Sequence, residues 1–263
     1  MSGAKTTSPR RVLVTGSAVG LGLGLARAFA EAGDTVYLTD ISPAVADAAR
    51  SLSDATGRPV GSSILDLAVD AAADRLAAEA TEAMGGVDIL VNNAVIRKIA
   101  AVTDLADADW NRALEVNLSA PFRLIRACLP GMRERGFGRI VNMASVYSLI
   151  ALANRADYVT TKHAMVGLTR TVALELASTR ITCNAICPGL MATDSALARI
   201  DTLAAERGIG RDEATALFLS TRQPGGRFIP METVTALALF LCGPQSDGIN
   251  GAAIPVDNGW SIA

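Results

Sequence analysis

Short β-branched runs alternate with Ala- and Leu-rich amphipathic segments along almost the whole chain, and this alternation constrains the fold most strongly. The runs have the length of strands, whereas the segments between them have a helical period. Alternating strands and helices favour parallel pairing through right-handed crossovers. We therefore expect one α/β domain, a doubly wound seven-stranded parallel sheet with helices on both faces. The expected strands are 11–15, 35–40, 60–65, 87–91, 139–143, 181–186 and 253–256.

The composition suits such a fold. Half of the 263 residues are hydrophobic, and only 4% are aromatic, so Ala, Val, Leu and Ile must form a large core. The formal net charge of −2 predicts neither nucleic acid nor an anionic membrane as a partner. Residues 1–10 are expected to be a flexible tail before a domain at 11–263. The first apolar run is too short for a signal peptide or a membrane span, which favours a cytoplasmic location.

The cysteines and the histidine exclude several classes of site. Cys128, Cys183, Cys187 and Cys242 lie in apolar surroundings without a C-x-x-C pair, which is typical of reduced buried thiols. His163 is the only histidine, so we expect no multi-histidine metal site. No G-x-S-x-G elbow is present, so we expect no hydrolase triad.

The segment from about 190 to 229 interrupts the alternation, because it contains helical segments without an early seventh strand. An insertion at the carboxyl end of a strand is well placed to cover a ligand as a lid. A purely structural helical excursion fits the same pattern, and the sequence leaves both interpretations open.

The first expected strand leads directly into a glycine-rich turn and a helix. Glycines permit a tight turn and close approach of the backbone to a pyrophosphate, and the N–H groups of the helix face the phosphates. This context predicts a dinucleotide-binding (Rossmann) domain. The positions concerned are Gly16, Ala18, Gly20, Leu21 and Gly22.

Two acidic residues follow the next strands. Asp40 ends the second strand, near the spacing expected for a carboxylate that binds the ribose 2′-hydroxyl. It would repel a 2′-phosphate, and no Arg or Lys stands beside it, so NAD is favoured over NADP. Asp66 ends the third strand, where it could reach the adenine or equally cap a helix.

Tyr158 and Lys162 lie four residues apart in an expected helix and therefore share one face. An ammonium group near a phenol favours the phenolate, which is the proton acceptor that an alcohol oxidation needs. Ser145 follows a strand that ends near this helix, and its hydroxyl could bind the substrate oxygen beside Tyr158.

Together these motifs resemble the short-chain dehydrogenase/reductase family over essentially the whole chain. The matching elements are Thr15-Gly16 with Gly20-Leu21-Gly22, Asn92-Asn93-Ala94, Asn117, Ser145, Tyr158 with Lys162, and Pro188-Gly189 with Thr193. The family usually has glycine at the positions of Val95 and Asn258. Val95 is expected to crowd the cofactor or reshape the pocket, whereas Asn tolerates a positive φ at 258.

The resemblance implies a role for each matching residue. Tyr158 would be the general acid/base, Lys162 would lower its pKa and hold the nicotinamide ribose, and Ser145 would orient the substrate oxygen. Asn117 would position a water in a proton relay. The residues implied to bind the cofactor NAD are Gly16, Ala18, Gly20, Leu21, Gly22, Asp40, Asp66, Leu67, Asn92, Ala94, Tyr158, Lys162, Pro188, Gly189, Met191 and Thr193. Members of the family are commonly homotetramers.

Within the family the sequence is most similar to the bacterial D-3-hydroxybutyrate dehydrogenases, in residues 181–189 and at the C-terminus. The positions that match their substrate anchors are Arg97, Tyr147, Arg155, Arg199 and Trp260, beside Ser145 and Tyr158. Arg155 and Arg199 also match the pair with which 2-(R)-hydroxypropyl-coenzyme M dehydrogenases bind a sulfonate. Guanidinium groups bind oxyanions in bidentate fashion. We therefore expect a small secondary alcohol that carries a carboxylate, dicarboxylate, sulfonate or phosphate.

Two other functions remain open at this stage. A neutral sugar or polyol dehydrogenase would not need the three arginines together. A non-catalytic NAD-binding scaffold would not need Asn117, Ser145, Tyr158 and Lys162 together.

Overall fold

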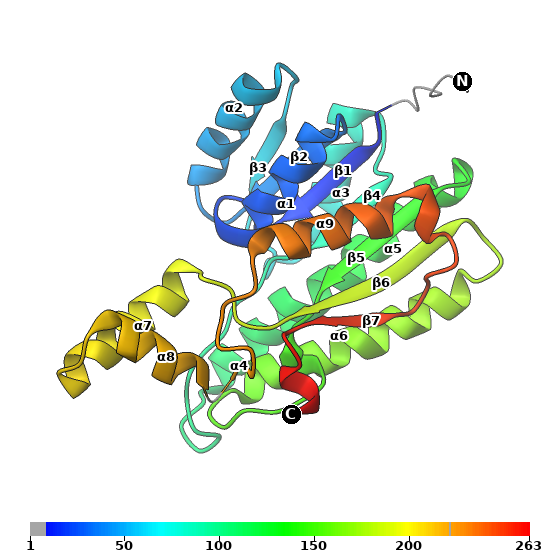
Figure 1. The fold of residues 1–263 in the computed structure, drawn as a ribbon. Helices are drawn as coiled ribbons and strands as arrows, with labels where there is room; N and C mark the ends of the chain where they lie inside the picture. Colours follow the sequence, from blue (N-terminus) through cyan, green and yellow to red (C-terminus); the bar gives the residue numbers. More distant parts are fainter. Residues whose placement is uncertain (1–8, 221) are drawn as a thin grey trace.

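The computed structural model describes residues 9–220 and 222–263. Its centre is a seven-stranded parallel sheet with the strand order β3-β2-β1-β4-β5-β6-β7 (Figure 1). The strands are β1 (Arg11–Thr15), β2 (Thr35–Asp40), β3 (Gly61–Ile64), β4 (Ile89–Asn92), β5 (Gly138–Met143), β6 (Ile181–Pro188) and β7 (Ala253–Val256). The predicted doubly wound sheet is thus confirmed. The strand order reverses between β1 and β4, and this is where such sheets bind ligands.

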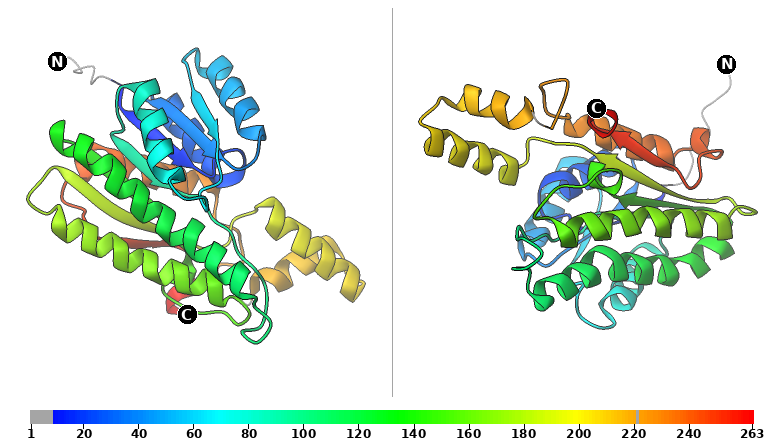
Figure 2. Two further views of the ribbon diagram at one scale, coloured as in Figure 1. Left: turned by 180° about the vertical axis from the view of Figure 1, so that it is seen from behind. Right: turned by 90° about the horizontal axis from the view of Figure 1, so that it is seen from below.

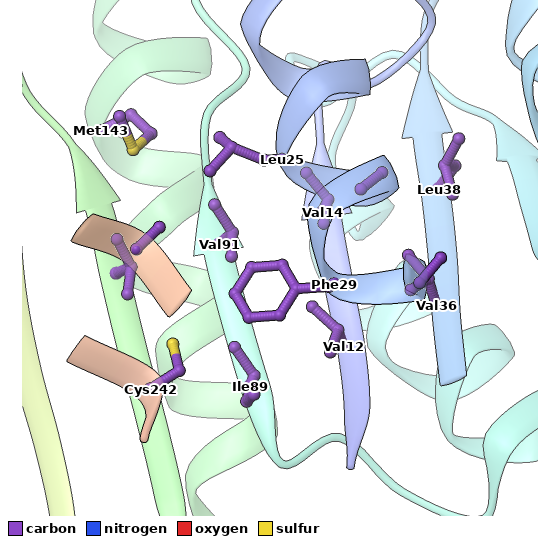
Figure 3. Close-up of a cluster of buried hydrophobic side chains, with 14 of the residues drawn as sticks. Val12, Val14, Leu25, Phe29, Val36, Leu38, Ile89, Val91, Met143 and Cys242 are labelled. Atoms are coloured by element: carbon purple, nitrogen blue, oxygen red, sulfur yellow. The ribbon is translucent and has the colours of Figure 1, made fainter. Parts of the chain in front are cut away.

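Helices cover both faces of the sheet. One face carries α1 (Gly20–Glu31), α2 (Ala44–Thr56) and α9 (Met231–Cys242), and the other carries α3 (Ala72–Met84), α5 (Ala120–Glu134) and α6 (Ala156–Glu175). Alternate residues of a strand point to opposite faces, so Val12 and Val14 enter the first core and Leu13 enters the second. Figure 3 shows the first core, where Phe29 of α1 packs over Val12 and Ile89.

The helix boundaries follow from local chemistry. Gly33 follows α1 with φ +94, a conformation that favours glycine. The N-cap of α2 is Pro43. The hydroxyl of Ser42, one residue further out in the same turn, accepts a hydrogen bond from the Ala44 N–H at 3.3 Å.

The chain between β6 and α9 forms a helical hairpin that projects from the body of the molecule (Figures 1 and 2). It contains α7 (Asp194–Arg207) and α8 (Arg211–Ser220), which pack on each other around Ile200, Ala214 and Phe218. Its base is closed by a hydrogen bond of 2.8 Å from the Ile229 N–H to the Leu190 carbonyl. None of the described helices is long and apolar enough to span a membrane.

Candidate active site

A cavity of about 450 Å³ lies at the carboxyl ends of the strands and extends from the glycine loop to the helical hairpin. Most of the residues predicted to form a site line this cavity. They are Gly16, Leu21, Gly22, Asp40, Asp66, Leu67, Ala94, Arg97, Ser145, Tyr147, Arg155, Tyr158, Lys162, Pro188, Gly189, Met191, Thr193, Arg199 and Trp260. The parallel connections bring together residues that are up to 244 positions apart, because every strand ends at the same edge.

Four predicted site residues do not line the cavity. Ala18 is buried, and its N–H donates to the Asp40 carboxylate at 3.0 Å. Gly20 begins α1 with φ +58. Asn92 lies behind the cavity and donates to Asn142 at 2.8 Å. Asn117 is buried within a π-helical turn, Glu115–Ser119, which joins α4 (Asp107–Leu114) to α5.

The glycine loop packs tightly against α1 and the end of β4, because side chains at its glycines would collide with neighbouring backbone atoms. A Cβ at Gly16 would lie 2.7 Å from the Ala94 Cα, and one at Gly22 would lie 2.0 Å from the Gly16 carbonyl oxygen. The Asn93 side chain donates to the Thr15 and Gly16 carbonyls, both at 2.9 Å. This contact ties the glycine loop to the end of β4, and a backbone cradle results at the start of α1.

Asp40 and Asp66, the two acidic residues predicted to bind the cofactor, have defined hydrogen-bond and ion-pair partners. Asp40 accepts hydrogen bonds from the backbone N–H groups of Ala18 and Ser42, both at 3.0 Å, and these bonds hold its carboxylate at the rim of the cavity. Asp66 accepts from the Ala68 N–H and forms an ion pair with Arg112 at 2.9 Å. Asp66 therefore closes a turn and lines the cavity, but it does not cap a helix, because the N-cap of α3 is Ala71.

Ser145, Tyr158 and Lys162 meet where β5 and α6 adjoin the cavity. Burial raises the pKa of Tyr158, and its hydrogen bond with Ser145 opposes this effect by favouring the phenolate. Lys162 lies over the Tyr158 ring and donates to the Met143 carbonyl. Burial lowers the pKa of Lys162 to about 8. A phenol that lies beside a serine hydroxyl and an ammonium group can serve as a general acid/base for an alcohol.

Asn117 joins three parts of the site through its side-chain amide. Its Oδ1 accepts from the Ile96 N–H at 2.8 Å, and its Nδ2 donates to the Ile96 carbonyl at 2.9 Å. Nδ2 also contacts the Thr161 hydroxyl, at 3.2 Å, in the helix that carries Tyr158 and Lys162. The amide is thus fully engaged in fixing the loop after β4 against α6.

Comparison with known proteins assigns the chain to a family. Residues 16–261 match the family model described as Enoyl-(Acyl carrier protein) reductase. D-beta-hydroxybutyrate dehydrogenases from Cupriavidus necator and Rhizobium meliloti are each 36% identical, over 95% and 96% of this chain and 97% and 98% of theirs. The chain belongs to the short-chain dehydrogenase/reductase family. It is therefore a nicotinamide-dependent oxidoreductase, and the expected similarity to the hydroxybutyrate dehydrogenases is confirmed.

A solved structure supports the same assignment. The L-sorbose reductase from Gluconobacter frateurii, complexed with NADPH and L-sorbose, superimposes with a TM-score of 0.92 at 30% identity. The match covers 97% of this chain and 98% of that one. The structure places both residues that depart from the family's usual glycines. Val95 is 38% exposed and lines the cavity, and Asn258 adopts φ 53.

The substrate half of this dehydrogenase cavity is rich in aromatic rings and arginines. Tyr147 packs edge to face against Trp260, with ring centroids 5.3 Å apart, and against Tyr158 at 6.1 Å. Arg97 donates to the Ser195 hydroxyl at 2.8 Å, which connects the loop after β4 to α7. These contacts form a wall that continues from the reacting groups to the hairpin.

Arg155 is the buried member of the arginine group, with 7% of its surface exposed, and its Nη1 atom has no hydrogen-bond partner among the described residues. Burial lowers its pKa, and the charges of Arg199 and Arg97 lower it further. Neither Arg97, Arg155 nor Arg199 forms an ion pair with a residue that the structure describes.

Several cavity residues were missed from the sequence. Arg112 reaches the end of the cavity at Asp66 from α4, and Ser195, Phe218 and Arg222 reach the opposite end from the hairpin. No motif marks them, because each stands in a helix or turn whose orientation depends on packing. The i, i+4 spacing of Phe218 and Arg222 was the one available signal, and the Arg222 guanidinium lies 4.7 Å from the Phe218 ring centroid.

Proposed function

We propose that the protein is an NAD-dependent dehydrogenase that interconverts a secondary alcohol and a ketone on a small anionic substrate. The similarity to the two D-beta-hydroxybutyrate dehydrogenases supports this reaction class and a substrate that carries an acid group. Asp40 at the rim of the cavity supports NAD, because a carboxylate would bind a ribose 2′-hydroxyl and repel a 2′-phosphate.

The proposed reaction needs a group that accepts the proton of the substrate hydroxyl. When bound, the nicotinamide ring supplies the acceptor of the hydride. Tyr158 takes the proton of the substrate hydroxyl, and the hydroxyl of Ser145 donates to the same oxygen. The charge of Lys162 stabilises the phenolate across the ring contact. We propose that Gly16, Gly22, Ala94, Gly189 and Thr193 hold the dinucleotide along the cavity.

The buried guanidinium of Arg155 is the main observation in favour of an anionic substrate. Transfer of a charge out of water costs several kcal/mol unless a partner compensates it. No described carboxylate forms an ion pair with Arg155, although the residue lines the cavity. A substrate anion at this position would supply the missing partner. Arg199 on α7 would bind the same anion, which makes the hairpin the proposed lid over the substrate.

The test is the rate of NAD reduction with 3-hydroxybutyrate, 2-hydroxypropanesulfonate and neutral polyols. Arg155→Gln should lower kcat/KM for the anionic substrates about ten- to a hundredfold, because each charged hydrogen bond contributes about 1.5–3 kcal/mol. The loss should fall mainly on KM, since the anion is bound alike in ground and transition states. Arg211→Gln in α8, outside the cavity, is the control, and its Asp201 ion pair is exposed.

A neutral sugar or polyol dehydrogenase is the second candidate, and the likeness to the L-sorbose reductase structure favours it. The same panel decides between the two. Turnover of polyols but of no anionic substrate, with rates unaffected by Arg155→Gln, would establish the polyol function and reject ours.

A further inference from the structure

Four arginines line the substrate half of the cavity, and each comes from a different segment. Arg97 follows β4, Arg155 is the N-cap of α6, Arg199 lies in α7, and Arg222 follows α8. Four separate segments that place the same cationic side chain around one space indicate a site for negative charge. The sequence motifs accounted for three of these arginines, and the fold adds Arg222.

The acidic residues that line the cavity lie at the end away from these arginines. Among the described residues that line it, only Asp40 and Asp66 are acidic, and both lie at the adenosine end. Asp66 is paired with Arg112 of that end. Asp40 is bound by two backbone N–H groups. The substrate half therefore has arginine, aromatic and neutral side chains but no carboxylate.

The arginines act on one another and on the reacting groups, so they form one cluster. Beside the larger effect of burial, the charges of Arg97 and Arg155 both lower the pKa of Tyr158. Arg155 is also within electrostatic range of Arg199. On the hairpin, Arg199 and Arg222 both lie over the Phe218 ring, with guanidinium carbons 5.7 and 4.7 Å from its centroid.

The number of positive charges in the cluster determines which net charge on a ligand it binds best. Arginine keeps its proton at all physiological pH values, so the cluster cannot discharge itself. A monoanion offers one negative charge and is fully bound by one or two guanidinium forks. The remaining cations would still repel one another across the cavity. A second negative charge on the ligand removes this repulsion.

We infer that the substrate carries two negative charges at the end held by Arg97, Arg155, Arg199 and Arg222, as a phosphonate or phosphate dianion or as paired carboxylates. This inference rests on the proposed function, because it specifies the anion of the same alcohol substrate. The shared chemistry is a divalent oxyanion on a small secondary alcohol.

Pairs of substrates with similar shapes and different charges test whether the enzyme prefers a dianion. 2-Hydroxypropylphosphonate is a dianion at pH 8.5, and 2-hydroxypropanesulfonate is a monoanion with a similar tetrahedral head. (1-Hydroxyethyl)malonate carries paired carboxylates, whereas 3-hydroxybutyrate carries one. In each pair, kcat/KM for the dianion should exceed that for the monoanion at least about tenfold, which corresponds to one additional charged hydrogen bond. The pair with the larger ratio identifies the kind of head group.

Substitutions test which arginine is responsible for the preference for a dianion over a monoanion. Arg222→Gln should reduce the dianion-to-monoanion ratio about tenfold, and Arg222→Lys, which keeps the charge, should retain most of it. Arg207→Gln removes an exposed charge from the same hairpin, outside the cavity, and should leave the ratio unchanged. NAD binding by each variant, measured by fluorescence quenching, verifies that the protein is folded.

The outcomes keep the two proposals apart. Equal kcat/KM for the dianion and the monoanion in both pairs would overturn the inference of a divalent substrate and leave the proposed function standing. A ratio that Arg222→Gln does not change, in a variant that still binds NAD, would overturn the role of the cluster. Turnover of polyols alone, with none of the four anions oxidised, would instead overturn the proposed function.

Discussion

At the scale of single residues, burial and nearby charges have opposite effects on the pKa of Tyr158, the proposed proton acceptor. Burial alone would keep the phenol protonated, because a buried anion loses its hydration. Ser145, Arg97 and Arg155 oppose burial from three different segments. The chemistry therefore depends on groups that no single motif contains.

We predict that Tyr158→Phe lowers kcat at least about a hundredfold while the affinity for NAD hardly changes, since general-base catalysis contributes about 10²–10⁴. The variant keeps the ring that packs on Tyr147 and loses only the hydroxyl. Steady-state rates and NAD titration measure the two quantities. Activity within tenfold of the parent protein would show that another group accepts the proton.

The pH dependence of oxidation follows from the same residue. The rate should rise with pH as Tyr158 loses its proton, because the phenolate is the active form. Arg155 lowers the pKa of Tyr158 by its charge, so Arg155→Gln should shift the pH–rate profile to higher pH. Comparison of kcat/KM profiles between pH 6 and 10 tests this direction, and a profile that does not move would contradict it.

Asp40 controls the choice of cofactor in our proposal. Asp40→Ala should lower kcat/KM for NAD about ten- to a hundredfold, because charged hydrogen bonds to the ribose are lost. The discrimination against NADP should narrow, since the repulsion of a 2′-phosphate disappears as well. Asp40→Asn keeps a side-chain acceptor without the charge and separates the two effects. Equal use of NAD and NADP by the parent protein would reject the assignment.

At the scale of elements, the connection between β1 and α1 shows how a backbone shape becomes a binding surface. Gly22 lies in the first turn of α1 against the Gly16 carbonyl, so the helix and the loop approach more closely than any side chain permits. Asn93 fixes the same loop from the end of β4. The loop is thus held by elements on both of its sides.

Substitution of glycine by alanine should have opposite effects in two helices. Gly22→Ala should destabilise the fold by about 1–3 kcal/mol and weaken NAD binding, because the new Cβ would lie 2.0 Å from a backbone oxygen. Gly167 lies on the exposed side of α6, with open space around it. Gly167→Ala should therefore stabilise the fold by about 0.5–1 kcal/mol. Denaturant unfolding of both variants provides the comparison.

At the scale of the whole molecule, ligand binding should couple to stability, because the proposed dinucleotide site joins segments from every part of the sheet. NAD at a hundred times its Kd should stabilise the folded state by about 2.7 kcal/mol. For a chain of this length, that corresponds to a rise in Tm of about 5 °C. NADP at the same concentration should raise Tm less. An equal rise with both dinucleotides would count against NAD selectivity.

The sequence alone determined the architecture and indicated the proposed reacting groups, because both depend on local patterns. Strand and helix periodicity specified seven parallel strands, and their predicted ends differ from the observed ends by at most two residues. Tyr158 and Lys162 are neighbours on one helix, and their spacing together with the preceding Ser145 predicted that they lie close together. The glycines of the β1–α1 turn were likewise recognisable, because their conformation is a local requirement.

Tertiary structure decided which polar residues face one another. Arg222 enters the substrate half only because α8 folds back beside α7, and Arg112 meets Asp66 across the adenosine half. Asn117 engages Ile96 through a packing contact between distant segments. The charge balance of the cavity, and with it the class of anion, depends on these long-range contacts. The periodicity of a sequence indicates which face of a helix is buried. It does not indicate which charged groups of other elements that face contacts.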